Sequence, residues 1–105
     1  MPRAKLNSKA SQFIYNRYIA GDPTREMAYE EEVTNAEIAR KIYDLRMKAG
    51  LTQQQLADRV GTTKSAISRL EDSDYAGHSL SMLRRIAGTL GKRVEIRFLP
   101  ARRTA

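Results

Sequence analysis

Residues 51–71 read LTQQQLADRVGTTKSAISRLE, and this stretch decides the fold. Thr52 followed three residues later by Gln55 is a capping-box pattern, which predicts a helix that ends just before Gly61. This glycine supplies a tight turn, and a second short helix is predicted up to Leu70. The spacing is that of a helix-turn-helix, although helical bundles of other functions also contain two short helices joined by a glycine.

The second predicted helix carries polar side chains on its outward face. Its apolar residues, Ile67 and Leu70, point inward at helical spacing. The residues left facing outward are Lys64, Ser65, Ser68 and Arg69. Such side chains hydrogen-bond to base edges or to phosphate, so the helix has the chemistry of a DNA-reading element.

The composition of the whole chain agrees with a nucleic-acid partner. The chain has 105 residues, of which 41% are hydrophobic and 30% charged, as expected of one soluble globular domain. Nineteen Lys and Arg against 12 Asp and Glu give a formal charge of +7, which favours a polyanionic partner. No apolar run approaches the roughly 18 residues that span a bilayer and no signal sequence is recognised, so we expect a cytoplasmic protein.

The residue types that enzymes and metal sites need are nearly absent. The chain contains no cysteine and one histidine, His78, which we expect in a loop. This excludes disulfides, thiolate zinc sites and most acid-base constellations. We therefore expect no enzymatic activity, no bound metal and no cofactor.

The charge falls into three blocks. Residues 1–20 carry +4, residues 21–37 carry −5 and residues 38–105 carry +8. An acidic middle block is repelled by phosphate, so it should point away from DNA or toward a basic protein. Its run of three glutamates, residues 30–32, is either a solvated helix face or a docking site for such a protein.

Periodicity and punctuation predict the remaining elements. The expected helices cover residues 11–20, 23–32, about 38–49 and about 79–90. Residues 93–98 alternate polar and apolar side chains, the pattern of a half-buried strand. An edge strand needs another strand to pair with, so we expect a symmetric homodimer; pairing with a peptide or toxin, or simple packing as a tail, are the alternatives. The expected dimer interface consists of Val94, Ile96 and Phe98.

The motif of residues 51–71, together with Ser79-Leu80 and Ile86-Ala87-x-x-Leu90-Gly91, resembles the XRE-type helix-turn-helix of phage repressors. The resemblance covers residues 38–91. It implies a five-helix repressor-like fold in which residues 64–70 form the recognition helix and lie in the major groove. The base contacts that we expect from family position and outward placement are Thr63, Lys64, Ser65, Ser68 and Arg69.

The resemblance also implies contacts around the recognition helix. Arg46 and Glu71 correspond to a family ion pair that is mainly structural. Phage repressors carry basic residues after the recognition helix where this chain has Asp72, Ser73 and Asp74, so backbone amides farther along the loop would have to hold phosphate. The expected phosphate contacts are Gln53, Arg46, Thr52, Gly77, His78 and Ser79.

A second resemblance, over residues 22–100, is to HigA-like antitoxins of toxin-antitoxin pairs. It implies an all-α fold: a five-helix helix-turn-helix domain with an N-terminal helical extension and a C-terminal β-strand for dimerisation. It also implies a homodimer that binds a palindromic operator, represses its own operon, and neutralises a small basic RelE- or HigB-like messenger RNA endonuclease. The alternative is a stand-alone XRE-type regulator without a toxin partner.

The N-terminal segment is our candidate for toxin binding. It crowds apolar and aromatic residues into a short stretch, and aromatic side chains of this kind are enriched at interfaces. The alternative is that these residues pack onto the core helices. The candidate residues are Phe13, Ile14, Tyr15, Tyr18 and Ile19.

The expected organisation has four parts. Residues 1–33 form a partly disordered extension, and residues 34–91 form the DNA-binding domain. Residues 92–100 form the dimerisation strand, and residues 101–105 form a disordered tail, as do residues 1–10 at the other end.

Overall fold

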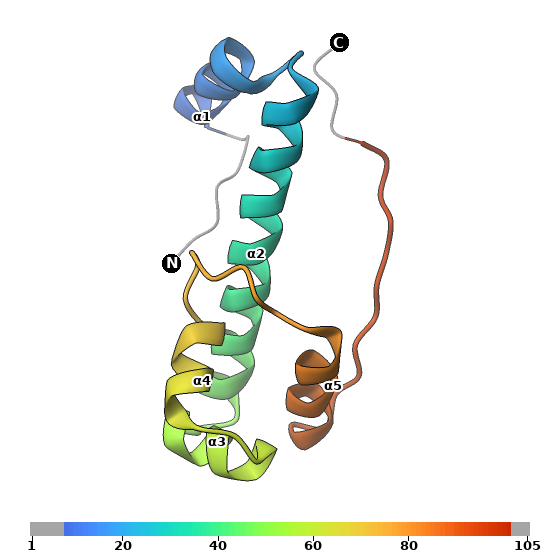
Figure 1. Ribbon diagram of the computed structural model, residues 1–105. Coiled ribbons are helices and arrows are strands. Elements are labelled where there is room, and N and C mark those ends of the chain that lie inside the picture. Colours follow the sequence, from blue (N-terminus) through green and yellow to red (C-terminus); the bar gives the residue numbers. More distant parts are fainter. Residues whose placement is uncertain (1–7, 102–105) are drawn as a thin grey trace.

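The computed structural model describes residues 8–101 and shows a helical chain (Figure 1). The elements are α1 (Lys9–Ile14), a π-helical turn η1 (Tyr15–Ile19), α2 (Pro23–Lys48), α3 (Gln53–Val60), α4 (Lys64–Leu70) and α5 (Leu80–Thr89). Lys9 and Ala10 belong to α1, so the expected N-terminal disorder is wrong there. The rest of that expectation, and nearly all of the expected C-terminal tail, lies outside the described residues. No helix within residues 8–101 is long and apolar enough to cross a membrane.

One long helix replaces two that the sequence predicted. Asp22 begins α2 by accepting hydrogen bonds from the backbone N–H groups of Thr24 and Arg25, at 3.0 and 3.2 Å, and Pro23 occupies the first helical position. The helix continues for 26 residues, so the break expected after residue 32 is absent. The reason is that no glycine or proline interrupts residues 24–48.

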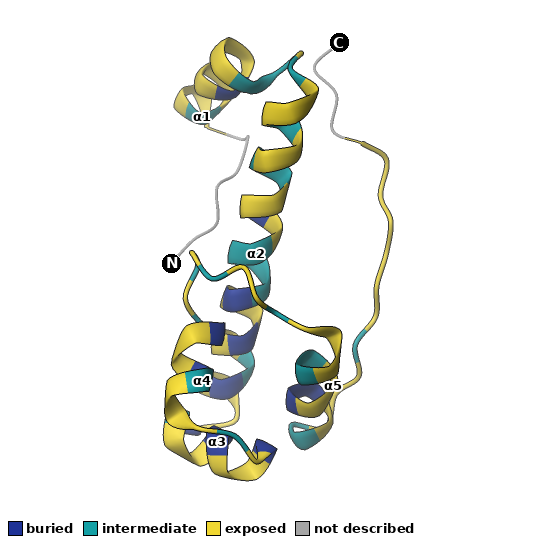
Figure 2. Cartoon of the chain, in the orientation of Figure 1, coloured by how far each residue is buried: buried dark blue, intermediate teal, exposed yellow. Residues whose placement is uncertain are grey.

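The hydrophobic core surrounds the second half of α2 (Figure 2). Helices α3 and α4 pack against each other, and α5 packs against α3 (Figure 1). The buried cluster consists of Ile42, Leu51, Leu56, Ala57, Val60, Ile67, Leu70 and Ile86. Each fully buried large aliphatic side chain contributes about 1.5–3 kcal/mol to folding. The first half of α2 extends beyond this cluster and is mostly exposed (Figure 2).

The part of the N-terminal extension that forms α1 and η1 folds back onto the beginning of α2. The ring of Tyr15 is 2% exposed and meets the ring of Tyr29 edge to face, with 5.0 Å between centroids. The guanidinium of Arg25 donates to the carbonyl of Tyr18 at 2.9 Å. Gly21, with φ of 85°, makes the reversal between the two parts.

The predicted C-terminal strand is wrong. No strand is assigned within the described residues, and the chain after α5 runs from Gly91 to Ala101 without regular structure. Ile96 is 61% exposed and Phe98 is 97% exposed. Alternating polar and apolar residues determine only which side chains would share a face of a strand. A strand also needs a second backbone segment to hydrogen-bond with, and none of the described segments provides one.

Candidate nucleic-acid interface

Helices α3 and α4 form the predicted helix-turn-helix, and Gly61 makes the turn between them. Its φ of 82° and ψ of 39° lie in the left-handed region, which glycine adopts without steric cost. The N–H groups of Gly61 and Thr62 both donate to the carbonyl of Ala57, each at 2.9 Å. This pattern ends α3 and allows α4 to start after only a few residues.

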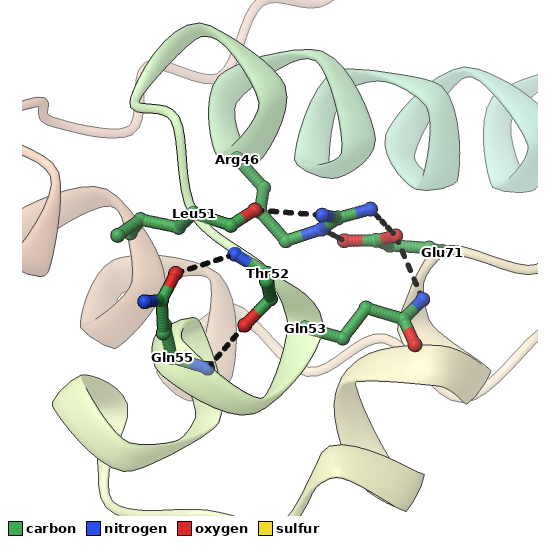
Figure 3. A network of polar contacts seen from close by, with 6 residues as sticks. All are labelled: Arg46, Leu51, Thr52, Gln53, Gln55 and Glu71. Carbon is green, nitrogen blue, oxygen red and sulfur yellow. Dashed lines mark hydrogen bonds and ion pairs between the residues drawn. The ribbon is translucent and has the colours of Figure 1, made fainter.

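The capping box predicted at the start of α3 is present (Figure 3). The hydroxyl of Thr52 accepts from the backbone N–H of Gln55 at 3.1 Å, and the side chain of Gln55 accepts from the backbone N–H of Thr52 at 2.9 Å. Both side chains therefore serve to fix the first turn of α3. This is a structural role for Thr52, which was expected to contact phosphate.

Helix α4 is fixed by its inner face and free on its outer face. Ile67 and Leu70 are buried, and the hydroxyl of Thr63 caps the helix by accepting from the N–H of Ala66 at 3.1 Å. The exposed residues of the helix, whose side chains make no hydrogen bond or ion pair with any described residue, are Lys64, Ser65, Ser68 and Arg69. These are the outward positions that the sequence predicted.

The expected ion pair between Arg46 and Glu71 is present (Figure 3). Nε and Nη2 of Arg46 donate to the two carboxylate oxygens at 2.6 and 3.0 Å, and Nη1 donates to the carbonyl of Leu51 at 2.8 Å. The hydrogen bonds from Arg46 to Glu71 raise the pKa of the arginine above its usual value, although its burial opposes them. The ring of Tyr43 lies 5.3 Å from the guanidinium carbon.

This network also orients Gln53. Its amide nitrogen donates to Glu71 at 3.2 Å, so the side chain lies against the end of α4 (Figure 3). One N–H of this amide remains for another acceptor. Arg46, by contrast, is only 7% exposed, and each of its three nitrogens donates a hydrogen bond inside the protein.

The loop between α4 and α5 is held by its own side chains. Nε2 of His78 lies 2.8 Å from the carbonyl of Leu70, and because a carbonyl only accepts, this nitrogen carries a proton. The ring of Tyr75 meets His78 edge to face and lies so close to Gly77 that a Cβ there would clash with the tyrosine hydroxyl. Ser79 caps α5 by accepting from Met82 at 3.1 Å. His78 was expected to contact phosphate, but these contacts turn its side chain toward the protein.

Three polar contacts had not been predicted. Gln53 binds Glu71, His78 binds the carbonyl of Leu70, and Arg85 of α5 donates to the carbonyls that end α3. The first and third join residues 18 and 25 positions apart, and the second spans the loop after α4, so nothing in the local pattern indicates the pairings. The position of Arg85 in the apolar pattern of α5 predicts only that its side chain is exposed.

The residues expected to bind a toxin do not share one surface. Tyr15 is buried and Ile19 is half-buried, whereas Phe13, Ile14 and Tyr18 are 64%, 52% and 55% exposed. Tyr15 therefore fits the alternative prediction, in which these residues pack within the protein. The other three keep exposed apolar surface.

Comparison with known proteins agrees with the helical motif. A family model described as helix-turn-helix matches residues 42–96, just over half of the chain. The chain belongs to the helix-turn-helix family. An uncharacterized HTH-type transcriptional regulator of Methanothermobacter thermautotrophicus is 45% identical over 51 residues, which cover 49% of this chain and 72% of the relative. No solved structure matches.

Family membership confirms the predicted helix-turn-helix and supports DNA binding. The resemblance to HigA-like antitoxins receives no such support. The matched region begins within α2, so α1, η1 and the first half of α2 lie outside it.

Proposed function

We propose that this helix-turn-helix protein is a sequence-specific transcription regulator that lays α4 in the major groove of DNA. The observation that carries the proposal is the division of α4 into two faces. Its inner residues are buried in the core, and its outer residues offer hydrogen-bonding groups that no described residue uses. A short helix held in this way can present side chains to base edges without first rearranging.

The proposed base contacts are Thr63, Lys64, Ser65, Ser68 and Arg69. Lys64 and Arg69 suit the two major-groove acceptors of guanine, whereas the serine hydroxyls can bind any base edge. The hydroxyl of Thr63 accepts a hydrogen bond in its cap but retains its own O–H as a donor.

The proposed phosphate contacts follow from which donors remain available. Gln53 has a free amide N–H, Thr52 has a free hydroxyl hydrogen, and Gly77 and Ser79 have backbone N–H groups. Arg46 and His78 are left out because their side chains are engaged inside the protein.

Substitutions on α4 test this proposal. A duplex is first enriched from a randomised pool by the wild-type chain, and affinities for it are measured by fluorescence anisotropy. Lys64→Ala and Arg69→Ala should each lose about 1–3 kcal/mol on this duplex and relax the preference at one base position. Lys41→Ala is the matched control, since it removes the same charge from an exposed position on α2. Equal losses in all three variants would contradict base reading by α4.

A homodimer belongs to this proposal. Two copies would place their recognition helices about 34 Å apart and would read the two halves of a palindrome. The support is the exposed apolar surface after α5, where Ile96, Phe98 and Leu99 are 61%, 97% and 78% exposed. Surface of this kind is typical of an interaction site.

A second candidate function is an antitoxin that also binds a small basic nuclease. One observation favours it: the extension outside the family match exposes Phe13, Ile14, Tyr18 and Met27, next to an acidic block of net charge −5. Aromatic side chains in an acidic setting suit a basic protein partner.

Growth rescue tests the second candidate. The chain is co-expressed with the product of the neighbouring small reading frame, and the wild type is compared with a Phe13→Ser, Tyr18→Ser double variant. Loss of rescue and of co-purification, with DNA binding retained, is the expected result. A neighbouring product that is neither toxic nor bound would leave a stand-alone regulator.

A further inference from the structure

Arg85 connects α5 with the turn of the helix-turn-helix. Its Nη2 donates to the carbonyl of Val60 at 2.8 Å and lies 3.4 Å from the carbonyl of Gly61. These two residues are the last of α3 and the left-handed residue that ends it. Arg85 therefore reaches the point where the chain turns from α3 toward α4.

The end of α3 needs such a donor. The last carbonyls of a helix have no partner within the helix and carry a partial negative charge. The N–H groups of Gly61 and Thr62 both go to Ala57, so they do not satisfy the carbonyls of Val60 and Gly61. The guanidinium of Arg85 lies over this bare end, and a Cβ at Gly61 would be 3.6 Å from Nη2.

The other end of α4 has its own attachments. The carbonyl of Leu70 accepts from His78, and Glu71, which follows the helix, binds Arg46. At the start of α4 the described side-chain hydrogen bond is the local cap of Thr63. Arg85 thus supplies the side-chain hydrogen bonds that connect the segment leading into α4 with a distant part of the described chain.

We propose that Arg85 is a positioning residue for DNA reading: it fixes the α3–α4 turn and with it the direction in which α4 enters the groove. This inference rests on the proposed function. Base contacts require side chains held to within about 0.5 Å. A turn that is ordered before binding avoids the entropy cost of ordering it on the DNA.

Arg84 supplies a matched control. It is the next residue on the same helix, it is exposed, and it makes no hydrogen bond or ion pair with any described residue. Replacing either arginine by alanine removes one positive charge from α5. Because counterion release depends on charge, the two variants should lose similar affinity for DNA of any sequence.

The test compares Arg85→Ala, Arg85→Lys and Arg84→Ala with the wild type, at a temperature at which circular dichroism shows all of them folded. Each binds two fluorescein-labelled duplexes, one enriched by the wild type from a randomised pool and one of random sequence. The ratio of the two affinities should fall about tenfold in Arg85→Ala and stay unchanged in Arg84→Ala. Arg85→Lys should recover part of the ratio, because an ammonium keeps the charge and a donor for the Val60 carbonyl but lacks the rigid planar guanidinium.

Hydrogen exchange of the free protein provides the second measurement. The amides of Gly61 and Thr62 should exchange faster in Arg85→Ala than in Arg84→Ala. An affinity ratio that changes equally in the two variants, or that stays constant while only the melting temperature falls, would overturn the positioning role. If the wild type enriches no duplex, the proposed function fails and the DNA-reading role of Arg85 fails with it. The exchange rates then decide separately whether Arg85 holds the turn.

Discussion

A buried ion pair joins the last turn of α2 to the end of α4. The side chains of Arg46 and Glu71 are 9% and 5% exposed, and the carboxylate receives hydrogen bonds from both Arg46 and Gln53. Removing two charges from water is costly, and close bidentate contact offsets that cost. Removing one partner would leave the other charge buried without a counterion.

We expect Glu71→Ala to lower the free energy of unfolding by about 3 kcal/mol. Asp44→Ala is the control, since it breaks an exposed i,i+4 pair with Arg40 and should cost under about 1 kcal/mol. Urea unfolding measures both. The raised pKa of Arg46 keeps this residue charged at all ordinary pH values, so its contribution would be lost only as the pH rises through that raised pKa. Equal losses in the two variants would contradict a structural role for the buried pair.

Some of these contacts could be predicted from the sequence, and others could not. Family position indicated the pairing of Arg46 with Glu71, and helical spacing indicated which residues of α4 face outward. The contacts of His78 and Arg85 depend on how the α4–α5 loop and α5 pack against α3 and α4. Such packing is a tertiary property that no local pattern encodes.

At the scale of elements, local chemistry set the boundaries well. The cap at Thr52 and the turn at Gly61 were predicted because each depends on a few neighbouring residues. The predicted break in α2 and the predicted strand after α5 were both wrong, for different reasons. The acidic stretch after Pro23 reads as a separate short helix but contains nothing to end it, and a strand depends on a partner that no segment of residues 8–101 supplies.

The packing of the N-terminal extension depends on Tyr15. We expect Tyr15→Ala to release α1 and η1 from α2, because it removes the edge-to-face contact with Tyr29 and the one buried side chain of η1. Limited proteolysis should then cut before Gly21 at a higher rate. Tyr18→Ala, which changes a 55% exposed residue, should leave the cleavage rate near that of the wild type. Similar cleavage of both variants would show that Tyr15 does not hold the extension.

At the scale of the whole molecule, α2 separates the helix-turn-helix core from α1 and η1. A helix of 26 residues is about 39 Å long, so it carries the extension well away from the core that holds α4 (Figure 1). The family match covers the core and leaves the extension outside. DNA reading is thus assigned to one end of the molecule, and protein binding is proposed for the other.

The proposed homodimer is also a property of the whole molecule. Ile96→Lys should reduce dimerisation, since it places a charge among the exposed apolar residues after α5. Ser81→Lys adds the same charge at an exposed position of α5 and is the control. Light scattering measures the mass of each. A wild-type chain that is monomeric, or a dimer that both variants retain, would contradict this interface.

The most direct test of DNA reading by α4 is amide chemical-shift mapping of the wild-type chain with its enriched duplex. We predict that the largest shifts fall on residues 63–69 and around Thr52 and Gln53, with little change in α1 and η1. Largest shifts in the N-terminal extension or after Gly91, with α4 unchanged, would contradict it.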